Sequence, residues 1–98
     1  MYIWYTMQIN AALQLLPFGN DKEKYTIIDN AISLIRKSGL KYKVCPFETV
    51  VEGQPKEIYA LIESIRVESL KQCTDLLLNV KFHAANRDLA FEEKLEKY

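Results

Sequence analysis

The alternation of two hydrophobic periods along the chain most constrains its fold. Residues 7–15 and 74–83 place apolar and polar side chains at alternate positions, as in a strand with one buried face. Between them lie two segments with apolar residues every three to four positions, the pattern of amphipathic helices. A β-branched run at 49–51, preceded by a second short apolar stretch, separates these two segments. The predicted order is therefore strand, helix, strand, strand, helix, strand.

Signals at both ends define the first helix. The breaker cluster at 17–20 is expected to end the first strand, and Asn20 with Glu23 forms a candidate capping box. Gly39 fits the left-handed position that follows a helix. The buried face is expected to carry the apolar stripe Tyr25, Ile28, Ala31, Ile32 and Ile35.

The second half of the chain repeats this pattern. Pro46 interrupts two short strands and favours a hairpin, and residues 53–55 suit a helix start with Pro55 in the first turn. Residues 91–98 are charged and helix-prone, which predicts a short terminal helix. The second buried stripe is expected to comprise Ile58, Leu61, Ile62 and Ile65, extended by Leu70.

The predicted order of elements points to one fold. Two right-handed crossovers place both helices on the same face of a four-stranded antiparallel sheet, which is the ferredoxin-like βαββαβ arrangement of the α+β class. At 98 residues the chain is long enough for one hydrophobic core and too short for two. The other sheet face is left open, and we expect a homo-oligomer to cover it.

Charge and hydrophobicity exclude several classes of partner. Thirteen Lys and Arg residues balance thirteen Asp and Glu residues, so no net charge attracts nucleic acid or an anionic membrane. No apolar run reaches the length of about 18 residues that crosses a bilayer. The first residues lack the basic region and cleavage site of a secretory signal. We therefore expect a cytoplasmic protein without membrane insertion or nucleic acid binding.

The sequence also argues against a metal site. Cys45 and Cys73 are too few and too widely spaced for a disulfide framework or a zinc site, and we expect two reduced thiols. His83 has no recognised metal-ligand spacing to either cysteine. No metal and no cofactor are therefore expected.

Three segments of the sequence resemble one family. They are residues 9–17 (INAALQLLP), 38–42 (SGLKY) and 46–53 (PFETVVEG), of which the two later segments are the more specific. Together they resemble the thiamine-binding YkoF-like proteins, and the resemblance extends over residues 7–82.

This resemblance implies more than the residue pattern does. It implies a ferredoxin-like fold, assembly into homodimers or homotetramers through sheet faces and edges, and binding of thiamine or its hydroxymethylpyrimidine moiety without turnover. Because the family-like sequence starts at Met7, we expect a single domain over 7–98 and an N-terminal extension over 1–6. Cys45 departs from the small residue that similar sequences have at this position, which affects ligand choice if it lines the pocket.

The hairpin supplies most of the candidate ligand-binding residues. An aminopyrimidine has a flat apolar face, a donor amine and ring acceptors. Thr49 is a candidate hydrogen-bonding partner for the ring, and Glu52 for the amine or the thiazolium charge. Phe47 or Phe18 could stack on the ring. Ser38, in the preceding family-like segment, completes the set.

Each of these side chains also has a purely structural interpretation. Ser38 fits a helix-end cap, Thr49 an ordinary strand position and Phe47 the core. Glu52 fits a carboxylate beside the N-terminus of the next helix. For Phe47 the sequence favours the core, and for the other three it leaves both roles open.

Two other classes of function compete with ligand binding. Catalysis is disfavoured because the sequence has no recognisable nucleophile with its base, phosphate-binding glycine loop or metal cluster. A structural or regulatory assembly module stays open, since ferredoxin-like folds serve many roles. An open cleft lined by Glu52 and an aromatic residue would favour ligand binding, whereas a closed apolar groove beside Thr49 would favour the assembly module.

Overall fold

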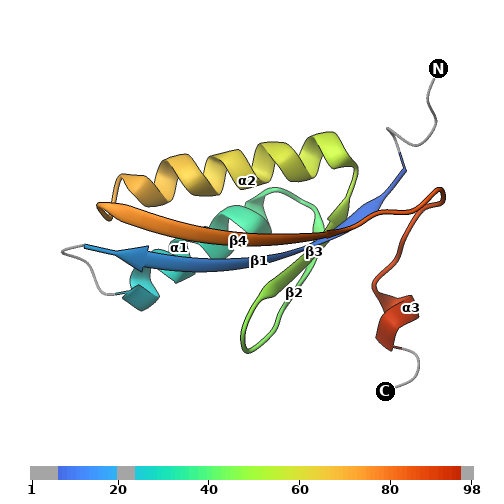
Figure 1. The fold of residues 1–98 in the computed structure, drawn as a ribbon, viewed down its shortest axis with the longest axis horizontal. Helices are drawn as coiled ribbons and strands as arrows, with labels where there is room; N and C mark the ends of the chain where they lie inside the picture. Colours follow the sequence, from blue (N-terminus) through green and yellow to red (C-terminus); the bar gives the residue numbers. More distant parts are fainter. Residues whose placement is uncertain (1–6, 20–23, 96–98) are drawn as a thin grey trace.

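The described residues form seven elements in the predicted order (Figure 1). The computed structural model describes residues 7–19 and 24–95. The elements are β1 (Ile9–Phe18), α1 (Lys24–Lys37), β2 (Lys41–Val44), β3 (Thr49–Gly53), α2 (Pro55–Leu70), β4 (Asp75–His83) and α3 (Glu92–Leu95). The predicted short C-terminal helix is therefore present as α3.

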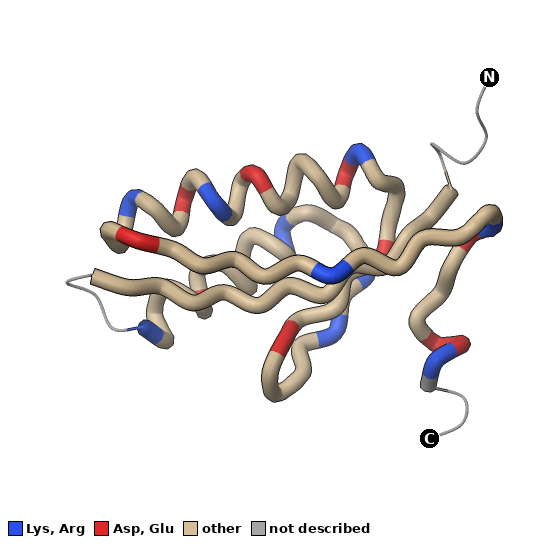
Figure 2. Tube along the Cα trace, in the orientation of Figure 1, with Lys and Arg blue, Asp and Glu red and all other residues tan. Residues whose placement is uncertain are grey.

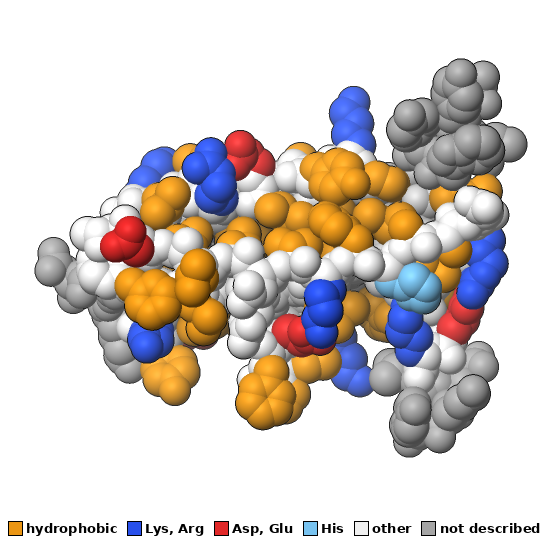
Figure 3. Space-filling view, in the orientation of Figure 1, with side chains coloured by type: hydrophobic (Ala, Val, Ile, Leu, Met, Phe, Trp, Pro, Cys, Tyr) orange, Lys and Arg blue, Asp and Glu red, His pale blue; other side chains and the backbone are white. Residues whose placement is uncertain are grey.

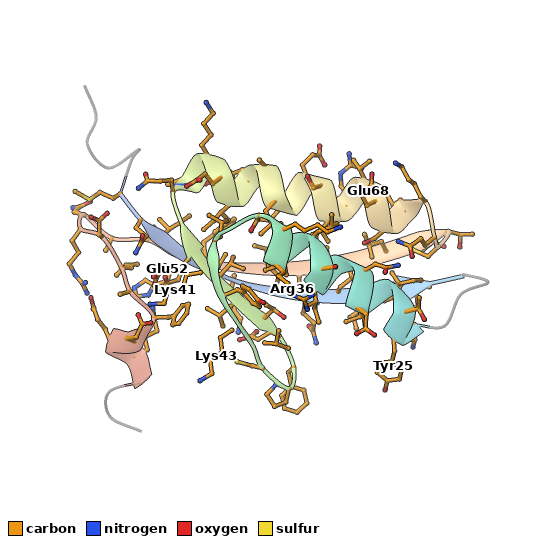
Figure 4. All side chains as sticks on the ribbon, turned by 180° about the vertical axis from the view of Figure 1, so that it is seen from behind. Tyr25, Arg36, Lys41, Lys43, Glu52 and Glu68 are labelled. Carbon is orange, nitrogen blue, oxygen red and sulfur yellow. The ribbon has the colours of Figure 1, made fainter. Side chains whose placement is uncertain are left out.

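The four strands form one antiparallel sheet in the order β2-β3-β1-β4. Each long helix connects strands that are not neighbours: α1 leads from β1 to β2, and α2 leads from β3 to β4. Both helices pack on the same face of the sheet (Figures 1 and 4). The predicted ferredoxin-like α+β fold is confirmed, and the opposite sheet face carries neither of these helices.

The hydrophobic core lies between the sheet and the two long helices. The odd positions of β1 that face the helices, Ile9, Ala11 and Leu13, are buried together with Val51 of β3. Burying an aliphatic side chain of this size contributes about 1.5–3 kcal/mol. A slip of one residue in β1 would exchange its two faces, so this burial fixes the register of the sheet.

The buried face of α1 differs from the predicted stripe. Ile27, Ala31 and Ile35 are buried, four residues apart, whereas Tyr25 is 70% exposed. The prediction was wrong for Tyr25 because several phases of a helical stripe fit this apolar-rich segment, and packing against the sheet selects one. The candidate capping box at Asn20 and Glu23 lies outside the described residues.

The first strand continues through the cluster that was expected to end it. Pro17 is buried and pairs with Leu76 of β4, and β1 ends only at Phe18. Pairing with β3 ends at Leu13, so β4 is the only described strand beside β1 at Pro17. A proline lacks one backbone donor and is tolerated where a strand is paired on one side.

The second helix begins and ends near its predicted limits. Pro55 occupies the first turn, and the buried stripe of Ile58, Leu61 and Ile65 is as predicted. At its last turn, however, Ser69 is buried and Leu70 is exposed. The expected extension to Leu70 was wrong because Ser69, four residues after Ile65, continues the stripe.

Candidate ligand-binding site

The sheet face opposite the helices contains two adjacent rows of side chains that run across all four strands. From β2 to β4, the first row is Lys41, Glu52, Asn10 and His83, and the second row is Lys43, Val50, Ala12 and Lys81. β1 itself carries no charged residue, so the charges of both rows come from the strands on either side of it (Figure 2). The centre of the second row is therefore apolar and both of its ends are cationic.

A cavity of about 420 Å³ lies over these rows. Its volume falls within the range of roughly 300–1,000 Å³ typical of small-molecule sites. Its walls come from β1, the β2–β3 hairpin, β4 and the segment that contains α3. The lining residues are Asn10, Ala11, Ala12, Lys43, Cys45, Glu48, Val50, Lys81, Phe82, His83, Phe91 and Lys94.

A buried carboxylate, Glu52, bonds to two of the residues that line the cavity. The Glu52 side chain accepts a hydrogen bond of 2.6 Å from the backbone N–H of Phe91, and the residue is only 6% exposed. Asn10 is buried beside it, and with its amide oriented to satisfy both neighbours, its nitrogen donates to Glu52 Oε1 at 3.2 Å. The amide oxygen of Asn10 then accepts from Lys94 Nζ at 2.7 Å. Glu52 thus holds two cavity-lining residues, Asn10 and Phe91, in place.

Lys41 links the same carboxylate to α3. Its Nζ lies 3.8 Å from Glu52 Oε2, 4.9 Å from the centre of the Phe91 ring, and forms an ion pair with Glu92 (Figure 4). The hydrogen bond with Glu92 raises the pKa of Lys41, and the same bond lowers the pKa of Glu92. Charge therefore fastens the C-terminal segment to the sheet.

Hydrogen bonds with Gln8 anchor the start of this segment. The backbone N–H of Leu89 donates to the carbonyl of Gln8 at 3.0 Å, and the side-chain amide nitrogen of Gln8 donates to the Leu89 carbonyl at 2.8 Å. Asp88 accepts from the Gln8 N–H at 2.6 Å. Leu89 and Phe91 are both buried, so residues 88–91 pack as part of the domain, and Phe91 lines the cavity.

None of the five predicted ligand-binding residues lines the cavity. Glu52 contacts the lining residues Asn10 and Phe91, but Thr49 lies two positions before the core residue Val51 and is buried on the helix-facing side of the sheet. Phe47 is 83% exposed at the hairpin tip, so its interpretation as a core residue was wrong. Phe18 is 45% exposed at the far end of β1. These aromatic residues do not share one pocket with Glu52.

Ser38 caps the end of α1, which is the structural role that its sequence position allowed. Its hydroxyl donates to the carbonyl of Ile35 at 2.5 Å and accepts from the N–H of Leu40 at 3.2 Å. These bonds form the turn after α1, where Gly39 has a φ of +78°. Ser38 therefore lies on the helix side of the domain, across the sheet from the cavity.

Sequence reasoning missed the residues that enclose the cavity. Asn10 gave a signal, since an asparagine between apolar residues of a strand needs a buried partner. Phe91 and Lys94 gave none, because local sequence does not show that the C-terminal segment folds back over the sheet. The family resemblance raised the question whether Cys45 lines the pocket. Cys45 does line the cavity, and the residue is partly exposed.

The fold and the cavity define a class of protein: a small ferredoxin-like domain with a ligand-sized hollow on the sheet face opposite α1 and α2. The chain belongs to the thiamine-binding protein family, whose sequence profile matches residues 11–98. The resemblance noted in the sequence is therefore confirmed over most of the chain.

Individual relatives agree with this assignment. A UPF0045 protein of Clostridium perfringens is 27% identical over 90 residues, which cover 91% of this chain and 95% of that protein. A proposed thiamine biosynthesis/salvage protein from Thermotoga maritima is 26% identical with a TM-score of 0.86, over 93% of this chain and 98% of that one. A domain of unknown function, DUF77, from Bacillus cereus has a TM-score of 0.90 at 22% identity, over 97% and 93% of the two chains, and shows the fold.

No helix within the described ranges 7–19 and 24–95 has the length and apolar character needed to cross a membrane. Nor do those residues contain a group of three or more His, Cys, Asp or Glu side chains that could hold a metal ion.

Proposed function

We propose that this protein is a cytoplasmic, non-catalytic binding protein for thiamine or its hydroxymethylpyrimidine moiety, and that the cavity over β1 is the binding site. The observation that carries this proposal is the buried Asn10–Glu52 pair at the end of a ligand-sized hollow with an apolar centre. The description of the family as thiamine-binding supports the choice of ligand.

Asn10 has the hydrogen-bonding capacity that an aminopyrimidine needs. A side-chain amide offers two donors and two acceptor lone pairs. The bonds to Glu52 and Lys94 use one of each, so one donor and one acceptor remain for a ring nitrogen and the adjacent amine. Ala12 and Val50 form an apolar floor for the flat ring, beside Phe91. Glu52 then acts by holding Asn10 and Phe91.

We further propose that the protein acts as a homo-oligomer. Phe18 and Leu77 are exposed hydrophobic residues on the helix-free sheet face, and β4 forms one edge of the sheet. Covering such a surface with a second copy removes apolar area from water. If no pyrimidine ligand binds, these surfaces favour the alternative function, a structural or regulatory assembly module.

Calorimetric titration tests the proposed ligand. Wild-type protein should bind thiamine or hydroxymethylpyrimidine saturably, and Asn10→Ala should weaken binding about tenfold or more through loss of its hydrogen bonds. Asn79→Ala is the matched control, because Asn79 lies on the same sheet face and bonds to Gln14, outside the cavity. Equal losses in both variants, or no binding in the wild type, would overturn the proposed site.

Alkylation of Cys45 gives an independent readout. Its thiol lines the cavity and is partly exposed, whereas Cys73 is buried and donates to the Ser69 carbonyl. A bound ligand should slow the reaction of Cys45 with a maleimide. Chromatography of the ligand after incubation with the protein should show it unchanged. Chemical conversion of the ligand would contradict the non-catalytic part of the proposal.

A further inference from the structure

Charge is distributed unevenly in this protein. The whole chain is neutral, yet three lysines, Lys43, Lys81 and Lys94, line the cavity together with His83, against one lining carboxylate, Glu48. Figure 3 shows Lys, Arg and His side chains near the C-terminal segment, and further Lys and Arg side chains elsewhere in the same view. The cavity is therefore a local cationic region on a protein without net charge.

The carboxylates nearby offset only part of this charge. Glu48 lies 3.5 Å from Lys81, but both side chains are partly exposed, and such pairs contribute only about 0–1 kcal/mol. Glu52 and Glu92 both contact Lys41 at the end of the cavity. Even when this Lys41 cluster is included, lysines outnumber carboxylates around the hollow.

One of the cavity lysines has no side-chain partner among the residues that the structure describes. Among the described residues, Lys43 takes part in no ion pair and its side chain in no hydrogen bond. Lys43 and Lys81 stand at opposite ends of the row whose centre is Val50 and Ala12. A ring on that centre would have an ammonium group within reach on both sides.

We infer that the preferred ligand of this cavity is a phosphate monoester, with its ring on the apolar centre and its phosphate held by Lys43 or Lys81. A cationic thiazolium is repelled by excess positive charge, whereas a phosphate forms charge-assisted hydrogen bonds with ammonium groups. This inference rests on the proposed function and specifies its ligand class: the phosphate esters of thiamine or of hydroxymethylpyrimidine.

A set of matched ligands tests the inference by calorimetry. Thiamine, hydroxymethylpyrimidine, their monophosphates and inorganic phosphate are titrated into wild-type protein at low and high salt. Each monophosphate should bind about tenfold or more tightly than its parent, since one charge-assisted bond is worth at least that factor. This advantage should shrink at high salt, where exposed charges are screened.

Substitutions that each remove one lysine charge show which lysine binds the phosphate. Lys43→Gln and Lys81→Gln should each reduce the ratio of the affinity for the monophosphate to the affinity for its parent, because each removes one ammonium group that could bind the phosphate. Lys56→Gln, at the start of α2 and outside the cavity, is the control and should change neither. Far-UV circular dichroism verifies that each variant is folded, which is expected for substitutions at exposed positions.

Each result separates this inference from the proposed function. Parents that bind as tightly as their monophosphates would overturn the phosphate inference and leave the pyrimidine site standing. Absence of binding by parents and esters alike would overturn the proposed function itself. Inorganic phosphate binding as tightly as the esters would also overturn the inference, because the ring would then contribute nothing.

Discussion

At the scale of single residues, Glu52 connects the sheet to the C-terminal segment. Its carboxylate accepts from a backbone N–H at 2.6 Å and from the Asn10 amide at 3.2 Å, in a buried position. Hydrogen bonds to a charged acceptor contribute about 1.5–3 kcal/mol, more than neutral ones. The sequence alternatives for Glu52 were ligand contact and helix-end carboxylate, and the structure adds a third role, the positioning of Phe91.

Substitution of this carboxylate should therefore destabilise the protein. We expect Glu52→Gln to lower the free energy of unfolding by about 1–3 kcal/mol, because an uncharged and partly mismatched amide replaces the acceptor. Urea denaturation measures this change. Glu48→Gln is the control, since its exposed pair with Lys81 contributes about 1 kcal/mol at most. Equal stability of the two variants would show that the Glu52 bonds add little.

Among the elements, the C-terminal segment should respond to pH through the Lys41–Glu92 pair. The pKa of Glu92 is lowered by its bond to Lys41, so its contribution is present above the ordinary Glu value and lost as pH falls through the lowered one. The pKa of Lys41 is raised by the same bond, so its contribution is lost only as pH rises through the raised value. The segment is held between these limits.

Hydrogen exchange measured by NMR tests this expectation. The protection factor of the Phe91 amide should fall on acidification below the ordinary Glu range, while that of Val51 in the core stays constant. In Glu92→Gln the acid-induced fall should be smaller, because the titrating group is gone. The same pH profile in Glu92→Gln and wild type would contradict this role of the pair.

The junction between β1 and the following segment depends on a glycine. Gly19 has a φ of +56°, and a Cβ there would collide with Thr74 Oγ1. We expect Gly19→Ala to lower the free energy of unfolding by about 1–2 kcal/mol or more. Gly39→Ala is the control: its φ is also positive, but its added Cβ meets nothing within 4 Å. A thermal unfolding comparison in which Gly39→Ala loses as much would contradict a steric role for Thr74.

Local sequence predicts the elements of this protein better than the site that they form. The period-two alternation predicts β1 and β4, and Gly39 predicts the end of α1, because these signals depend on neighbouring residues alone. The phase of the α1 stripe and the passage of β1 through Pro17 depend on packing and strand pairing, which local sequence does not specify. The cavity requires both the sheet register and the return of Phe91 to Glu52, a contact between residues 39 positions apart.

For the whole molecule, the helix-free face divides into two parts with different consequences. One part holds the cavity and its lysines, and the other ends in Phe18 and Leu77, which are 45% and 55% exposed. Stacked sheets pack about 10 Å apart, so a second copy placed face to face would bury the side chains of Phe18 and Leu77. Such a pairing would also close the open side of the cavity, which links assembly to ligand binding.

A charge at Leu77 should therefore weaken self-association. We expect Leu77→Lys to shift wild-type oligomers toward monomers in sedimentation velocity over a range of concentrations, since a lysine would be desolvated in the interface. Val67→Lys is the matched control, because Val67 is 40% exposed on α2, which packs on the opposite side of the sheet. A wild-type protein that stays monomeric at every concentration would contradict pairing through this face. A Leu77→Lys variant that associates as the wild type does would also contradict this pairing. In either case the cavity would remain open to solvent when its ligand is bound.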